Sequence, residues 1–359
     1  MKDSVSATSG VFRLYVTSIG AANAAAAGAI SKGLGIAPEA AAQCLYKAPS
    51  LVADGLAAPI ADQMQELLAA LGLETLVLDA DAPAPVKSEA TYDLGVYFED
   101  ASKLPEVAVD LAEFLGASPA QAIAMLCTPP GVILGGVSEP TVEALRKRLE
   151  RPGVEIMASE KSEAQYGLIF DDLSDLHRQS LGRDLEGMGR SLDSPGTLEW
   201  ADAERLWRRH GPAGLRIVDM AFLRFDVLLT EWTDSTAARS ALENQAGVPA
   251  DIIDDVVGAI PVALEEGLTG EQARAAVMAY AAAGLGVMAD PITFQSVSIS
   301  VAHASHPKVL GEALQSIGMG DGTAPDLPWT SPPLTELQAR FAELVLQEAG
   351  AAVSLEVAQ

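Results

Sequence analysis

The residue types that most often carry chemistry are sparse in this chain. It has four histidines and two cysteines among 359 residues. His303-Ala-Ser-His306 could supply two metal ligands, but no cysteine or carboxylate cluster nearby would complete a site. The favoured interpretation is a solvated turn between a strand and a helix. The sequence therefore predicts no metal site.

Other potential sites also favour simpler interpretations. Cys44 and Cys127 lie in apolar helical segments (AQCLY and AMLCT), which is typical of reduced core thiols. Either would be a nucleophile only with a histidine brought in from another part of the chain. The glycine-rich stretches Leu134–Pro140 and Gly318–Pro325 lack the pattern and the lysine of a phosphate-binding loop. We expect no catalytic residue and no cofactor.

Carboxylate pairs and tryptophans are interpreted in the same way. No pair stands beside a histidine in the sequence, so all are expected on solvated faces; they are Asp171/Asp172, Asp254/Asp255 and Glu265/Glu266. Trp200 and Trp207 lie seven residues apart, a helical spacing that favours a place in the core. An exposed stripe would instead make them interface anchors.

The net charge of the chain limits the kinds of partner that it can bind. The formal net charge is −26, which repels nucleic acid and anionic lipid surfaces and suits either solubility or a basic protein partner. The first ten residues lack an apolar signal core, and no run of 18 apolar residues occurs. We expect a cytoplasmic protein that does not insert into membranes.

The elements that would position any site follow a repeated glycine/proline frame. Four landmarks recur three times with steps of 14, 6 and 17 residues. They are Gly35, Pro49, Gly55 and Gly72, then Gly116, Pro130, Gly136 and Gly153, and then Gly247, Pro261, Gly267 and Gly284. Because glycine and proline punctuate backbone geometry, the landmarks predict turns and helix ends, with the glycines at positive φ or at close contacts. The chain is therefore predicted to repeat one structural unit.

Each unit is predicted to follow the order β-α-α-β-α-β. The opening strands are rich in β-branched and aromatic residues, as in Val11–Ile19, and amphipathic helices precede the last glycine. The predicted fold is α+β, a tandem array of small sandwich modules of which four are clear and one is shortened. The predicted ranges are 11–79 (module 1), 91–159 (module 2), 165–221 (shortened module 3), 223–290 (module 4) and 293–358 (divergent module 5).

The joints and the last module differ from this frame. Residues 80–90 (ADAPAPVKSEA) are expected to be a flexible Pro/Ala linker. The segments that connect modules 3, 4 and 5 are very short, so these modules are expected to pack rigidly. In module 5, the segment Asp321–Pro333 replaces part of the middle helix and strand. Thr269/Gln272 in module 4 and Thr335/Gln338 in module 5 each predict a capping box.

The frame, with an apolar strand before it and a short strand after the proline, resembles the C-terminal domain of the bacterial ribosomal stalk protein. Gly33–Leu56 carries the likeness best. The related Clp-protease adaptor shares this type of fold. The family domain recruits translation GTPases through lysines on its first two helices. The matching positions here are not basic; they are Gly28 and Ala42, Val109 and Ile123, and Ser240 and Asp254. The resemblance thus implies the fold but not a role in the ribosomal stalk.

Three functions are compatible with this sequence. The modules are repeated and the sequence shows no set of catalytic residues, which favours a non-catalytic scaffold or adaptor that binds other proteins. A structural subunit that associates with itself is the second hypothesis, because the arginine-rich segment 177–216 could meet an acidic segment of a neighbour. An enzyme with a site between modules is the third, and it needs a cleft in which His177 or His210 meets carboxylates.

The predicted partner site is an acidic helix face in module 4. A basic amphipathic helix would suit acids set beside apolar residues, although a solvated face is the alternative. The residues are Asp251, Asp254 and Asp255 together with Ile252, Ile253 and Val256. Trp329, within the proline-rich insertion of module 5, is the predicted exposed aromatic contact.

Overall fold

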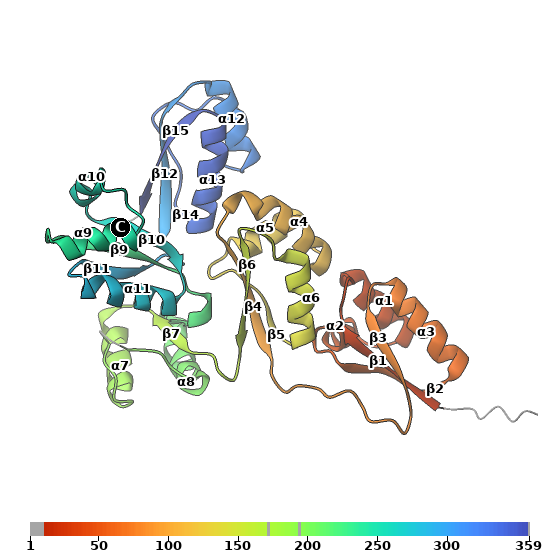
Figure 1. The fold of residues 1–359 in the computed structure, drawn as a ribbon. Helices are drawn as coiled ribbons and strands as arrows, with labels where there is room; N and C mark the ends of the chain where they lie inside the picture. Colours follow the sequence, from red (N-terminus) through yellow and green to blue (C-terminus); the bar gives the residue numbers. More distant parts are fainter. Residues whose placement is uncertain (1–10, 171–172, 193–194, 358–359) are drawn as a thin grey trace, which may run out of the picture. The chain divides into compact units, whose positions relative to one another are not determined.

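A computed structural model describes residues 11–170, 173–192 and 195–357 (Figure 1). The protein belongs to the α+β class, with helices and strands in several small sheets. Modules 1 and 2 fall within one compact unit, and modules 3, 4 and 5 within a second, to which Cys127–Gly131 also belongs. None of the helices in the described residues combines the length and apolar character needed to cross a bilayer.

Modules 1, 2 and 4 share one order of elements. Module 1 contains β1 (Val11–Ser18), α1 (Ala24–Leu34), α2 (Pro38–Tyr46), β2 (Ser50–Ala57), α3 (Ala58–Ala70) and β3 (Glu74–Asp79). Module 2 contains β4 (Tyr92–Phe98), η1 (Ala101–Lys103), α4 (Leu104–Leu115), α5 (Pro119–Leu126), β5 (Val132–Val137), α6 (Glu139–Leu149) and β6 (Val154–Glu160). Module 4 contains β9 (Phe225–Glu231), α9 (Thr236–Asn244), α10 (Ile253–Gly258), β10 (Val262–Leu268), α11 (Gly270–Ala282) and β11 (Gly286–Pro291).

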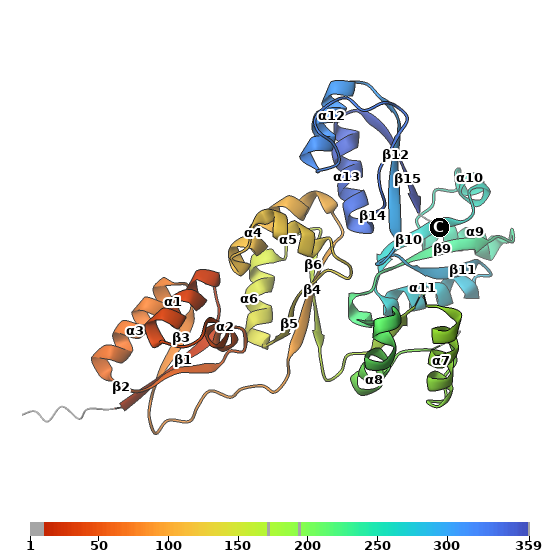
Figure 2. The ribbon, with the colours of Figure 1, turned by 180° about the vertical axis from the view of Figure 1, so that it is seen from behind.

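Each of these modules has a three-stranded antiparallel sheet with the opening strand at its centre. The strand orders are β2-β1-β3, β5-β4-β6 and β10-β9-β11. In module 2, α4 and α6 lie on the same side of β4, as both views show (Figure 1 and Figure 2). The opening strands bury Leu14, Leu94 and Val227 completely, since these residues meet the helices.

The frame residues occupy matching backbone positions in the three modules. All nine frame glycines have φ between 65° and 89°, a left-handed conformation in which a β-carbon is strained. The three frame prolines each follow a cis peptide bond, as Pro328 does in module 5. Gly55, Gly136 and Gly267 each sit where the pairing with the opening strand shifts register. These glycines therefore form β-bulges, in which one strand carries an extra residue.

Two of the bulges are fixed by an aspartate on the opening strand. The backbone N–H of Gly136 donates to Asp93 Oδ1 at 2.8 Å, and that of Gly267 donates to Asp226 Oδ1 at 2.9 Å. Module 1 has Arg13 in the corresponding place, and the N–H of Gly55 donates instead to its neighbour Asp54. The aspartates satisfy a backbone donor that the bulge leaves without a ladder partner.

Modules 3 and 5 differ from this order: module 3 has a two-stranded sheet and module 5 a four-stranded one. Module 3 contains β7 (Tyr166–Ile169), α7 (Asp175–Glu186), α8 (Trp200–His210), η2 (Gly211–Ala213), β8 (Arg216–Asp219) and η3 (Met220–Phe222), with β7 and β8 as its two-stranded sheet. Module 5 contains β12 (Ser296–Ala304), α12 (Pro307–Ser316), β13 (Trp329–Thr330), β14 (Leu334–Thr335), α13 (Glu336–Glu348) and β15 (Ala351–Val357). Modules 3, 4 and 5 each enclose a separate hydrophobic cluster.

Local sequence signals explain where several helices begin. Both predicted capping boxes are present, at Thr269 with Gln272 and at Thr335 with Gln338. Each threonine hydroxyl accepts from the backbone N–H of the glutamine, and each glutamine Oε1 accepts from the backbone N–H of the threonine. Ser118 caps α5 by accepting from the N–H of Gln121.

Modules 1 and 2 are joined by specific contacts as well as by the linker. The carbonyl of Tyr46 accepts hydrogen bonds from the N–H of Ser138 at 2.9 Å and from Thr141 Oγ1 at 3.0 Å. Arg148 donates to the carbonyls of Ala21 at 2.7 Å and Ala22 at 3.2 Å. The linker residues 83–91 have no regular secondary structure, as expected. The two modules are nevertheless in contact, because buried polar groups of module 2 take their hydrogen-bond partners from module 1.

Candidate functional site

An apolar groove lies on module 1 between its first and third helices. It has a volume of about 510 Å³ and is lined by residues of both helices and by Val52 of β2. Its larger side chains are Ile30, Leu34, Val52, Met64, Leu67 and Leu71, and the remaining lining residues are alanine, glycine and leucine. No charged side chain lines the groove, so burial of apolar surface is the interaction it offers.

The groove exposes side chains that a solvated helix would keep polar. Leu67 on α3 is 66% exposed, and Leu71, which directly follows that helix, is 37% exposed. Single exposed apolar residues are normal on proteins, whereas a lined groove with several of them marks an interaction surface.

The same place on module 2 is closed. Phe114 on α4 is 1% exposed, and its ring centroid lies 5.9 Å from that of Tyr46 of module 1. The guanidinium of Arg148, on α6, lies 5.3 Å from the centroid of the same ring. The face between the first and third helices is therefore an interface in module 2, where module 1 covers it.

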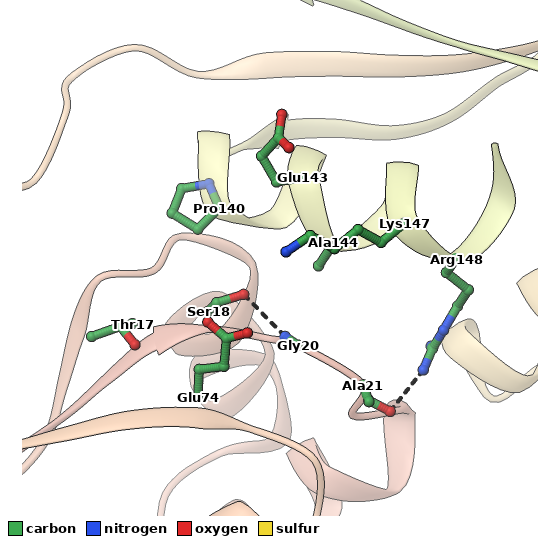
Figure 3. A pocket seen from close by; sticks show the side chains of 10 residues that line it. All are labelled: Thr17, Ser18, Gly20, Ala21, Glu74, Pro140, Glu143, Ala144, Lys147 and Arg148. Carbon is green, nitrogen blue, oxygen red and sulfur yellow. Dashed lines mark hydrogen bonds between the residues drawn. The ribbon is translucent and has the colours of Figure 1, made fainter.

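A second hollow lies at this junction of modules 1 and 2 (Figure 3). It has a volume of about 570 Å³ and is lined by Glu74 and Ser18 from module 1 and by Glu143 and Lys147 from module 2. Figure 3 shows Arg148 donating to the carbonyl of Ala21 at its edge. Its acids and its lysine come from open helix and strand surfaces, which is typical of a hydrated cleft between packed modules.

The predicted acidic face of module 4 is only partly as expected. Asp251 and Asp255 are exposed, and Ile252 is 40% exposed. Ile253 was expected on this face but lies in the module's core at 1% exposure. Asp254 is paired with Arg239 at 2.9 Å. That arginine also binds Asp234 and lowers its pKa by hydrogen bonding. The acidic face is thus narrower than predicted.

The tryptophans depart from their predictions. Trp329 is half-buried against the core of module 5, so the prediction of an exposed aromatic contact is wrong. Trp200 and Trp207 were expected in the core but are 37% and 48% exposed on α8. The ring of Trp200 packs 5.3 Å from that of Tyr166, centroid to centroid. The seven-residue spacing placed both on one face of the helix but did not reveal which face is covered.

The histidines are spread over separate surfaces. His306 lies in the exposed turn before α12, as expected, whereas His303 is exposed within strand β12. His177 is exposed, with its Nδ1 2.8 Å from Ser174 Oγ. His210 is buried, and its Nε2 lies 2.7 Å from Asp184 Oδ2. A histidine does therefore meet a carboxylate, but this ring is 2% exposed and connects α8 to α7.

The cysteines and the carboxylate pairs are partly placed as the sequence predicted. Cys127 is buried, and burial raises its thiol pKa to about 11; Cys44 is half-buried rather than in the core. Glu265 was expected on a solvated face but is half-buried and accepts a hydrogen bond from the buried Tyr280 at 2.8 Å. Asp171 and Asp172 lie outside the described residues.

Within residues 11–170, 173–192 and 195–357, no three histidine, cysteine or carboxylate side chains gather in a way that could hold a metal ion. Comparison of the chain with protein-family models, with curated proteins and with solved structures found no match.

Proposed function

We propose that the protein is a non-catalytic interaction scaffold or adaptor that acts in the cytoplasm and binds a protein partner through the groove on module 1. One observation carries this proposal. The face between the first and third helices is apolar and exposed in module 1, whereas module 2 uses the corresponding face as an interface.

Affinity capture with the full chain tests the proposal. The wild type, Leu67→Glu and Met278→Glu are immobilised, and proteins retained from native lysate are quantified by mass spectrometry. Met278 is a matched control because it is 68% exposed, like Leu67, but lies on module 4. We expect a protein that the wild type and Met278→Glu retain and that Leu67→Glu loses. If Leu67→Glu retains every captured protein as well as the wild type does, the groove is not the binding surface.

Self-association is the second candidate function, and the exposed face of α8 favours it. Trp207 is 48% exposed, and the side chains of Arg205 and Arg208 are 64% and 72% exposed. An aromatic side chain among arginines suits an acidic surface, and Asp251 and Asp255 on module 4 offer one in a second copy.

Light scattering distinguishes this alternative. If α8 mediates self-association, the mass measured at 50 mM salt should exceed that of one chain and should fall to it in Arg208→Glu and at 500 mM salt, because salt screens exposed charge pairs. A monomer at both salt concentrations would rule it out.

A further inference from the structure

The glycine frame allows modules 1 and 2 to be compared residue by residue at the groove. Two positions before the glycine that ends the first helix, module 2 has Phe114 and module 1 has Gly33. A β-carbon built on Gly33 meets no heavy atom within 4 Å, apart from its chain neighbours and its own helix backbone. In module 2, the space beside the helix at this position holds an aromatic ring. In module 1, the same space is open.

A second pair of positions differs in the same direction. In module 2, Arg151 Nη2 lies 2.6 Å from Asp110 Oδ2, so an ion pair connects the segment that follows α6 to α4. The corresponding positions in module 1 are Ala29 and Ala70, both of which line the groove. Module 1 therefore lacks both the ring that fills this face in module 2 and the ion pair that closes it.

The groove walls also limit the form of a ligand. α1 and α3 are continuous helices, so their backbone N–H and C=O groups are already paired within each helix except near the ends. An extended peptide laid between them would find few partners for its own backbone groups. A helix satisfies its own backbone and presents apolar side chains at helical spacing.

We propose that the groove of module 1 receives an aromatic side chain presented by an amphipathic helix of a protein partner, and that this ring takes the place that Phe114 occupies in module 2. This inference rests on the proposed function and names the chemistry of the partner. Module 2 gives the precedent for the covering element as well, because the residue that packs on Phe114 is Tyr46, at the end of helix α2. Since no charged side chain lines the groove, binding depends little on salt.

Gly33→Phe supplies the ring from within the chain. Gly33 lies inside α1 at a helical φ, so the substitution is compatible with the backbone. We expect the variant to remain folded, with a melting temperature equal to or above that of the wild type, because glycine is a poor helix former and the new ring would cover exposed leucine. The variant should no longer bind the partner helix, since its groove is filled.

The test uses displayed peptides as the probe. A library of 16-residue amphipathic helices, with the central position of the apolar face randomised over all residue types, is selected on the full-length wild type at 150 mM salt. We expect Phe, Tyr or Trp to be enriched at that position. Selected peptides should bind Gly33→Phe and Leu67→Glu about tenfold more weakly or worse, and Met278→Glu unchanged. Their affinity should change less than about twofold at 500 mM salt.

Several results would overturn the inference. These are selection without aromatic enrichment, peptides that bind Gly33→Phe as well as the wild type, and basic peptides whose affinity collapses with salt. A dimer of the wild type that Gly33→Phe abolishes would identify the occupant as a second copy. If lysate capture depends on Leu67 but the library selects no aromatic residue, the inference fails and the scaffold function stands. If aromatic helices bind but no captured protein depends on Leu67, the scaffold function fails instead.

Discussion

At the scale of single residues, Asp226 combines a structural role with an electrostatic cost. It accepts the N–H of Gly267, which lowers its pKa, but burial has the larger effect and raises it. Glu266, Glu336 and Asp290 raise it further. The carboxylate is therefore held in a place that disfavours its charge.

Asp226→Asn should stabilise module 4 at pH 7, since an amide oxygen can still accept from Gly267 without carrying charge. The folded-state pKa lies above that of the unfolded chain, so the cost of the charge appears as pH rises through the folded pKa. The gain of the variant should fade as pH falls toward about 3.9, where the unfolded carboxyl titrates. Hydrogen exchange of the β9 amides at pH 7 and pH 4 measures both effects. A gain of equal size at the two pH values would contradict this explanation.

The two thiols should differ in reactivity. Burial raises the pKa of Cys127 to about 11, so little thiolate forms at pH 8, whereas Cys44 is half-buried and more accessible. A thiol reagent at pH 8 should modify Cys44 in the native protein and Cys127 only after unfolding. Cys44→Ser and Cys127→Ser variants assign the two rates. Fast labelling of native Cys44→Ser would show that Cys127 is accessible.

Residue types alone predicted backbone geometry better than they predicted contacts. The frame glycines have the positive φ that their spacing suggested, and both threonine capping boxes are present. Glu265 was wrongly predicted on a solvated face, because its partner Tyr280 lies 15 residues away. The sequence did not identify Asp184 as the partner of His210, because the two lie 26 residues apart. Nothing in the local pattern indicates which polar side chain the fold will cover.

At the scale of elements, the bulge in β5 depends on one glycine. Gly136 has φ 66°, and a β-carbon there would meet no heavy atom within 4 Å. Gly136→Val should therefore destabilise module 2 through backbone strain rather than a clash, by about 1–3 kcal/mol. Denaturant unfolding measures the loss.

Gly28→Ala is the contrasting control for Gly136→Val. Gly28 lies inside α1 with open space around it and without a positive φ. Alanine there should stabilise the helix by about 0.5–1 kcal/mol. Equal effects of the two substitutions would show that backbone conformation does not govern the loss at Gly136.

The element order could be predicted from the sequence, but the groove was missed. Hydrophobic periodicity predicts that α3 is amphipathic, with Met64, Leu67 and Leu71 on its apolar face, but it does not show whether that face is covered. The open groove could have been found by comparing the residues at matching positions of modules 1 and 2. Small residues at Gly33 and Ala70 stand where module 2 has Phe114 and Arg151, so less side-chain volume covers the same sheet.

At the scale of the molecule, Arg148 joins modules 1 and 2. Its guanidinium binds two carbonyls of module 1 and lies over Phe114. Arg148→Ala should loosen module 1 from module 2 without unfolding either. Rotational correlation times from NMR relaxation should be shared by modules 1 and 2 in the wild type and should separate in the variant.

Arg146→Ala is the matched control for Arg148→Ala. Arg146 lies two residues away on the same helix, but its guanidinium pairs with Glu143 of that helix at 3.1 Å. Its removal should leave modules 1 and 2 coupled. Separated correlation times in both variants would show that loss of charge on α6, rather than the contacts of Arg148, loosens the modules.

The association of modules 1 and 2 could not be predicted from the linker. Pro/Ala composition indicates a flexible connection, and residues 83–91 indeed lack regular secondary structure. Docking is instead specified by Tyr46 at the end of α2 and by Thr141 and Arg148 of α6. The three acceptors are the backbone carbonyls of Tyr46, Ala21 and Ala22. Every residue type has such a carbonyl, so the amino-acid composition does not indicate these contacts.

These shared contacts determine where the chain can be divided. A fragment beginning at residue 91 would uncover the ring of Phe114 and leave Ser138 and Thr141 without the carbonyl of Tyr46. Produced alone, it should be prone to aggregate, because an apolar face that is normally covered would meet water. A recombinant fragment spanning 11–163 keeps both partners and should remain soluble. Dissection of this protein should therefore begin with that pair of modules.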